Sequence, residues 1–217
     1  MSARGGALAL LAFLTRTGLA LGAAPPCTSI PGERTHSGFF ARSEPGLAFF
    51  WASVAGSLGP LGRTGIRGLG QSGAIDFGGT PARGLVLGGT VWTARIDPVF
   101  IEGGKSVSPD DDSVKVTQLR LGPFLDWYPN PARGFHTTVS FGLVVQIESD
   151  VKGNPLRPLA YGGALATGTG YEWFVSDVLS LGLLGRFALG SVVRQVGAAS
   201  ERTLFIVPEL AISATYH

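Results

Sequence analysis

The sequence predicts an all-β protein, a single antiparallel up-and-down barrel of eight strands, and three observations lead to this prediction. Apolar residues recur at every second position through much of the chain, which is the period of a strand with two different faces. The 217 residues include 33 Gly and 14 Pro, and both residue types weaken helix interiors. Hydrophobic residues make up 45% of the chain and charged residues only 15%, a composition that excludes a disordered chain.

The strands follow from the alternation, which is clearest in the last segment. From Leu204 to Tyr216 the even positions are mostly large and apolar, whereas the odd positions include Glu209, Ser213 and Thr215. A bulge is expected in the first strand at Pro45-Gly46. The predicted strands are 38–53, 72–80, 85–95, 115–128, 135–147, 159–174, 178–189 and 204–216.

The connections between these strands alternate in length, so all short turns are expected at one end of the barrel. The short connections are 80–84, 129–134 and 175–177. Long connections are predicted at 54–71, 96–114, 148–157 and 190–201. This is the arrangement that transmembrane barrels prefer, with short turns in the periplasm and longer loops outside the cell.

The two faces of the strands indicate which side meets lipid. The less apolar face carries mostly Gly, Ala, Ser and Thr, and the whole chain has only three lysines. A face exposed to water would carry frequent Lys, Glu and Asp, whereas small residues suit the crowded interior of a narrow barrel. We therefore expect the apolar face to point outward into a membrane.

Aromatic residues provide a second indication, because they gather near the strand ends. Transmembrane barrels carry such girdles at the two membrane interfaces. The residues predicted for these girdles are Phe49, Phe50, Trp51, Trp92, Trp127, Tyr128, Phe135, Tyr171, Trp173 and Tyr216.

In these features residues 38–217 resemble the small eight-stranded outer-membrane β-barrel proteins of Gram-negative bacteria. The resemblance implies a location in the outer membrane, contact with its lipid and lipopolysaccharide, and insertion by the barrel-assembly machinery. Members of this group usually end in an aromatic residue, whereas here Tyr216 is followed by His217. A monomer is expected.

The first residues have the order of a secretory signal peptide, which we place at 1–24. Arg4 precedes an apolar run at 7–14, and small residues end the segment. A membrane anchor is less favourable, because Arg16 interrupts the apolar stretch. Residues 25–37 would then form a periplasmic arm, in which Cys27 is either an unpaired thiol or, less favourably, a lipid attachment site.

Removal of this segment would also balance the formal charge of the chain. The whole sequence carries +2, and both Arg4 and Arg16 lie within 1–24. No cationic surface for nucleic acid is therefore expected.

Polar residues predicted to face inward are the candidates for chemistry. Asp126 and His136 flank the same turn and are expected to face each other, with Ser140 on the face of His136. An Asp-His-Ser set could support acyl hydrolysis, but an interior polar cluster is the preferred interpretation. The predicted cluster consists of Arg120, Asp126, His136, Glu172, Arg186 and Glu209, which would form either a salt-bridged plug or a charge-lined pore.

Neither a metal site nor a cofactor is predicted. The acidic run 110–112 lacks the spacing of a calcium loop, and the histidines His36, His136 and His217 lack metal-site spacing. We therefore expect a non-enzymatic outer-membrane barrel with a structural or surface-interaction role through its loops. A narrow passive pore, a lipid-modifying enzyme and a soluble lipocalin-like carrier are the competing interpretations.

Overall fold

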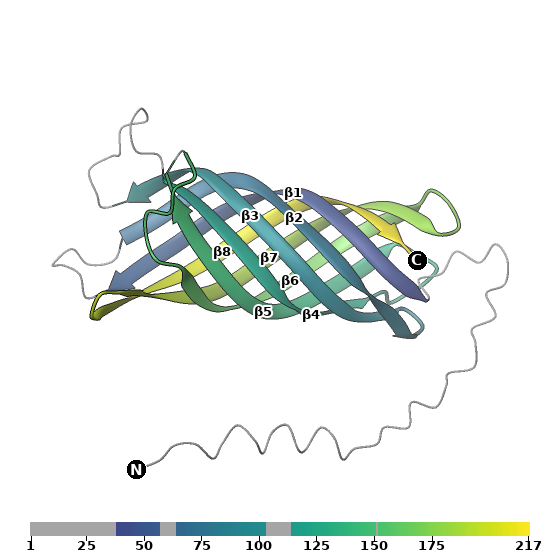
Figure 1. Cartoon of the computed structure of the whole chain (residues 1–217). Helices are drawn as coiled ribbons and strands as arrows, with labels where there is room; N and C mark the ends of the chain where they lie inside the picture. The colour runs from purple at the N-terminus through teal and green to yellow at the C-terminus, as the bar shows by residue number, and fades with distance from the viewer. Residues whose placement is uncertain (1–37, 57–63, 103–113, 151) are drawn as a thin grey trace, which may run out of the picture. The chain divides into compact units, whose positions relative to one another are not determined.

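Eight antiparallel strands close into a barrel in the computed structural model, which describes residues 38–56, 64–102, 114–150 and 152–217 (Figure 1). Each strand pairs with its neighbours in the chain, and β1 also pairs with β8. The strands are β1 (Phe39–Gly56), β2 (Thr64–Ala82), β3 (Leu85–Glu102), β4 (Lys115–Trp127), β5 (Phe135–Ser149), β6 (Ala160–Phe174), β7 (Leu179–Val196) and β8 (Ala199–Tyr216). This architecture confirms the predicted all-β fold of eight antiparallel strands. The described residues contain no helix long and apolar enough to cross a membrane.

Side chains alternate strictly between the inside and the outside of the barrel. In β4 to β7 the buried positions carry even numbers, and in β8 they carry odd numbers. The change of parity follows from the pairing of β7 with β8, in which Arg186 lies opposite Glu209. Paired residues share a face of the sheet, so both side chains point inward.

Three of the predicted long connections are shorter in the structure, and the one predicted at 96–114 is shortened because β3 continues to Glu102. Strand β7 continues to Val196 and β8 begins at Ala199, so that the predicted loop 190–201 is a hairpin with Gly197 in its turn. Gly197 has a φ of 61°, a conformation that glycine adopts without strain. Strand β2 begins at Thr64 rather than at 72, because its glycine-rich start pairs through the backbone without an apolar alternation.

The connections gather at two ends of the barrel, which we call the turn end and the loop end. Residues 83–84, 128–134 and 175–178 form the turn end, where the C-terminus also lies (Figure 1). The opposite end carries the β5–β6 connection, which begins at Asp150. Both the side-chain amide and the backbone N–H of Asn154 donate to Asp150, each at 2.8 Å, and these bonds hold the pKa of that carboxyl below its usual range.

The predicted bulge at Pro45-Gly46 is wrong, because the register of β1 with β2 runs through these residues without a shift. Pro45 removes one donor from the ladder, and this loss requires no additional residue in the strand. Register shifts occur instead between β2 and β3, at Gly68/Gly70 and at Gly79/Ala82.

The barrel interior is layered along its axis, as the inward residues of β1 illustrate. Phe40 belongs to a small apolar cluster at the turn end, Arg42 and Glu44 are buried and charged, and Phe50 belongs to a larger apolar cluster toward the loop end. Charged side chains therefore lie between two apolar layers. This arrangement places the candidate site within the barrel, in its turn-end half.

Candidate functional site

Arg42 is the centre of the charged layer, and its guanidinium contacts carboxylates from four strands, the most distant of them Glu172 at 3.8 Å. Its Nη1 lies 2.6 Å from Asp126, its Nη2 donates to Asp76 at 2.8 Å, and its Nε lies 2.7 Å from Glu44. The residue is only 2% exposed. Because β1, β2 and β4 are joined through one cation, the layer ties together strands that are distant in sequence.

Asp126 and His136 lie against each other across the β4–β5 hairpin. His136 Nδ1 is 2.9 Å from Oδ1 of Asp126, and the imidazole stacks on the ring of Tyr128 with centroids 5.0 Å apart. A side chain at position 170 would collide with the imidazole, since a Cβ built on Gly170 would lie 2.3 Å from His136 Nε2. The absence of a side chain at Gly170 therefore leaves the space that the imidazole occupies inside the barrel.

The geometry does not assemble the Asp-His-Ser set that acyl hydrolysis would require. Nε2 of His136 is the atom that would take a proton from Ser140, and this atom is buried without a hydrogen-bond partner in the part of the chain described. Ser140 lies inside the barrel on the same strand but makes no hydrogen bond with His136 within these residues. The pair thus serves to complete the ionic layer.

Glu172 forms the turn-end edge of the same layer. Its carboxylate accepts hydrogen bonds from the hydroxyls of Thr215 at 2.6 Å, Ser180 at 2.8 Å and Tyr128 at 3.3 Å. The imidazole of His217 lies 3.6 Å from Glu172 and 3.0 Å from the Ser180 hydroxyl. These contacts join β6, β7 and the C-terminus, and they place the last residue inside the barrel.

A second cation, Arg186, extends the network toward the loop end. It pairs with Glu44, and its Nη1 lies 3.4 Å from Glu209. Glu209 also accepts hydrogen bonds from Ser72 and from the indole N–H of Trp92, both at 2.8 Å. Glu44 therefore connects the Arg42 and Arg186 groups into one continuous network.

Arg120 completes the predicted set, but it is held differently. Its guanidinium lies over the ring of Trp92, 4.9 Å from the centroid. Its Nε and Nη2 have no hydrogen-bond partner among the described residues. All six residues predicted for the polar cluster thus lie inside the barrel, and five of them belong to one hydrogen-bonded or ion-paired network. Arg120 contacts this network through the ring of Trp92, which donates to Glu209.

The sequence reasoning missed the three residues that hold the network together, Arg42, Glu44 and Asp76. Asp76 could have been found from position alone, because it lies between the outward residues Ile75 and Phe77, whereas Arg42 and Glu44 flank the outward Ser43. The sequence reasoning also missed a smaller polar group near the loop end. There Arg194 lies 2.7 Å from Glu148, and Gln146 bonds both Gln118 and Glu148.

The aromatic residues divide between the two faces of the barrel. Seven of the predicted girdle residues are exposed on the outside: Phe49, Trp51, Trp127, Phe135, Tyr171, Trp173 and Tyr216. The prediction is wrong for Phe50, Trp92 and Tyr128, which are buried inside. Each shares its parity with inward residues of its own strand or adjoining segment, so strict alternation outweighs the tendency of rings to face lipid.

Comparison with known proteins finds a shared fold and no match by sequence. No family model matches the chain, and no curated protein matches its sequence. The structure is similar to that of the outer membrane protein OprG from Pseudomonas aeruginosa, with a TM-score of 0.51, 11% identity, and coverage of 85% of this chain and 99% of that chain.

Two further solved structures resemble the barrel. Neisserial surface protein A has a TM-score of 0.48 at 15% identity, covering 83% of this chain and 97% of that chain. The outer membrane protein AlkL has a TM-score of 0.49 at 14% identity, covering 83% of this chain and 90% of that chain. The resemblance to OprG shows that the chain has the fold of a small eight-stranded outer-membrane β-barrel.

Proposed function

We propose that this chain is a small outer-membrane protein whose barrel spans the lipid around a filled, ion-paired interior and acts through the surface of its loop end. The observation that carries the proposal is the inverted distribution of polarity. Leu143 on the outer face is 76% exposed, whereas Arg42 inside the barrel is 2% exposed. A barrel in water would have the opposite arrangement, and a barrel in lipid would have this one.

The spacing of exposed rings supports the same location. In β1, Phe39 and Trp51 both face outward, one near each end of the barrel. They are twelve residues apart, which at about 3.3 Å per residue and a tilt of about 40° separates them by roughly 30 Å along the axis. This separation matches the hydrocarbon core of a bilayer, which is about 30 Å thick.

The buried network favours a plug over the narrow pore. The side chains of Arg42, Asp126 and His136 have no solvent exposure, and together they span the barrel from β1 to β5. An eight-stranded barrel has an interior that is just wide enough for its own side chains to fill. We therefore expect no sustained conductance through the closed barrel.

A soluble carrier and a lipid-modifying enzyme have weaker support from the geometry. A lipocalin-like carrier would need an apolar interior and a charged outer face, whereas here the charged residues lie within. A lipid-modifying enzyme based on His136 would need a nucleophile at Nε2, and none is bonded there among the described residues. A structural or surface-interaction role requires neither feature.

The proposal includes export and insertion of the chain. The signal peptide at 1–24, the arm at 25–37 and Cys27 all lie outside the described residues, as does the acidic run at 110–112. Export through this signal, insertion by the barrel-assembly machinery and function as a monomer that meets lipopolysaccharide therefore remain proposals.

Heat-modifiability tests the membrane location. An outer-membrane fraction would be run on SDS gels both unheated and boiled, and a folded barrel is expected to migrate differently in the two lanes. The purified chain would then be tested in planar bilayers, where we expect no stable channels. A soluble periplasmic band that does not shift on boiling would contradict the proposed membrane location. Stable open channels in planar bilayers would contradict the filled interior and favour the narrow pore.

A further inference from the structure

The outer wall formed by β7, β8 and β1 changes from polar to apolar over a few residues. Cross-strand pairing arranges its outward side chains in rows that run across the three strands. From the loop end toward the turn end, the rows are Val193–Arg202–Ala55, Ser191–Leu204–Ser53 and Leu189–Ile206–Trp51. A cation is thus followed by two hydroxyls and then by a wholly apolar row.

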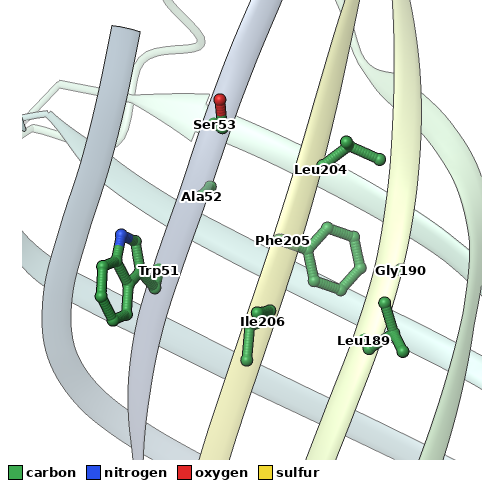
Figure 2. Close-up of a pocket in the computed structure, with 8 residues that line it drawn as sticks. All are labelled: Trp51, Ala52, Ser53, Leu189, Gly190, Leu204, Phe205 and Ile206. Atoms are coloured by element: carbon green, nitrogen blue, oxygen red, sulfur yellow. The ribbon is translucent and has the colours of Figure 1, made fainter.

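A groove of about 370 Å³ lies on this wall, lined by residues of the second and third rows (Figure 2). Trp51, Leu189, Leu204 and Ile206 line it, and each of them is exposed. Phe205 turns its ring inward under Gly190, where an added Cβ would lie 2.5 Å from the ring. The groove is therefore an apolar depression in the outer surface of the barrel. The buried ring of Phe205 closes it on the inner side.

Arg202 is the cation at the loop-end edge of this groove. It is exposed, and it lies on the same face of β8 as Leu204 and Ile206. Glu201, the acidic residue next to Arg202 in β8, is paired with Arg157. No acidic residue in the described ranges pairs with Arg202, so its charge is available to a ligand.

We propose that this wall binds one anionic phospholipid molecule, an inference that rests on the proposed membrane location. Arg202 binds the phosphate of the headgroup, because a guanidinium forms paired hydrogen bonds with phosphate oxygens. The hydroxyls of Ser53 and Ser191 lie at the level of the ester groups, and an acyl chain lies over Ile206 between Trp51 and Leu189. Trp51 sits at the interface, where its indole suits the boundary of polar and apolar layers.

Quenching of Trp51 fluorescence by brominated lipid measures this binding directly. The chain has four tryptophans, and Trp92 lies inside the barrel, so replacement of Trp127 and Trp173 by Phe leaves Trp51 as the lipid-exposed reporter. The protein would be folded into phosphatidylcholine vesicles that contain dibrominated phosphatidylglycerol, and into matched vesicles with dibrominated phosphatidylcholine. We expect the anionic lipid to be preferred at Trp51 by about five-fold, the effect of one cation near a membrane surface.

Three variants distinguish lipid binding by Arg202 from a general effect of positive charge on the barrel surface. Arg202→Gln is expected to remove the preference, and Arg202→Lys to retain most of it. Arg95→Gln is the matched control, because Arg95 is also an exposed arginine in the loop-end half but adjoins a polar hollow lined by Gln71 and Asp97. This control is expected to keep the preference for the anionic lipid. Flotation with the vesicles and a shift on boiling show that each variant is inserted and folded.

Each outcome bears on a different statement. Equal quenching by both lipids in the unaltered chain would overturn the lipid site, as would an equal loss in Arg95→Gln and Arg202→Gln. Quenching by neither lipid would mean that another protein surface, such as a second copy of the chain, covers the groove, which also overturns the site. A chain that fails to float with the vesicles would contradict the proposed function itself.

Discussion

The two halves of the barrel interior are built on different principles. Toward the turn end, Arg42 and Arg186 bind carboxylates from β1, β2, β4 and β8 in a single buried network. Toward the loop end, the interior is an apolar cluster of mostly small side chains with Phe50 stacked on Phe205, followed by ion pairs near the barrel mouth. Stability should therefore depend on ionic contacts in one half and on packing in the other.

The largest effect is expected from the centre of the turn-end network. Arg42→Met leaves Asp76, Asp126 and Glu44 without their shared cation in a buried layer. Removing one partner of a buried ion pair costs about 3–5 kcal/mol. We expect a loss of this size in the free energy of unfolding, measured by urea titration in lipid vesicles. An unchanged urea midpoint would show that the buried network does not stabilise the barrel.

The outer face gives the next largest effect. Leu210 is exposed on β8, midway along the outward-facing apolar stretch between Leu204 and Tyr216. An arginine near the bilayer midplane costs about 2–4 kcal/mol, and near an interface only about 0–1 kcal/mol. Leu210→Arg is therefore expected to destabilise the barrel in vesicles more than Leu204→Arg does. Equal effects at the two positions would show that the outer wall has no depth profile.

His136 allows a finer test of the turn-end half. His136→Phe keeps a ring beside Tyr128 and removes the contact of Nδ1 with Asp126. Loss of a buried hydrogen-bonding partner costs about 1–3 kcal/mol. Urea unfolding should show a decrease in this range, smaller than that of Arg42→Met. A decrease equal to that of Arg42→Met would place the imidazole, rather than the guanidinium, at the centre of the network.

The smallest effect is expected at the loop end, where the same residue type is exposed. The side chain of Arg157 is 52% exposed and lies 3.2 Å from Glu201. Exposed ion pairs contribute about 0–1 kcal/mol. Arg157→Met should therefore change the urea midpoint far less than Arg42→Met. Similar losses for these two arginines would remove the distinction between the halves.

The fold could be predicted from the sequence wherever side chains alternate between apolar and polar or small residues. The hydrophobic alternation in β8 predicted its outward face from Leu204 to Tyr216, and the number and antiparallel order of the strands followed from the same pattern. The start of β2 and the β7–β8 hairpin were missed because backbone pairing there does not depend on an apolar pattern. Boundaries of this kind are set by tertiary pairing.

The site was less predictable than the fold, since its contacts join distant strands. The Asp126 and His136 pair could be expected from the short hairpin between them, whereas the contact of Arg42 with Asp126 depends on the closure of the barrel and on its stagger. Trp92 was assigned to the outside because rings are common at membrane interfaces. Its parity in β3 and its bond to Glu209 place it inside.

The central claim is that lipid surrounds the apolar face and that the opposite face is enclosed. Two adjacent residues of β8 test it, because Leu210 points outward and Ala211 is buried inside. After Cys27, the only cysteine, is replaced by Ser, a spin label would be attached at Leu210→Cys or at Ala211→Cys in separate proteins reconstituted in bilayers. We predict that the label at 210 is relaxed strongly by oxygen, which concentrates in lipid, and weakly by a water-soluble nickel complex, while the label at 211 is shielded from oxygen. Stronger relaxation by the nickel complex at 210, or by oxygen at 211, would contradict the account.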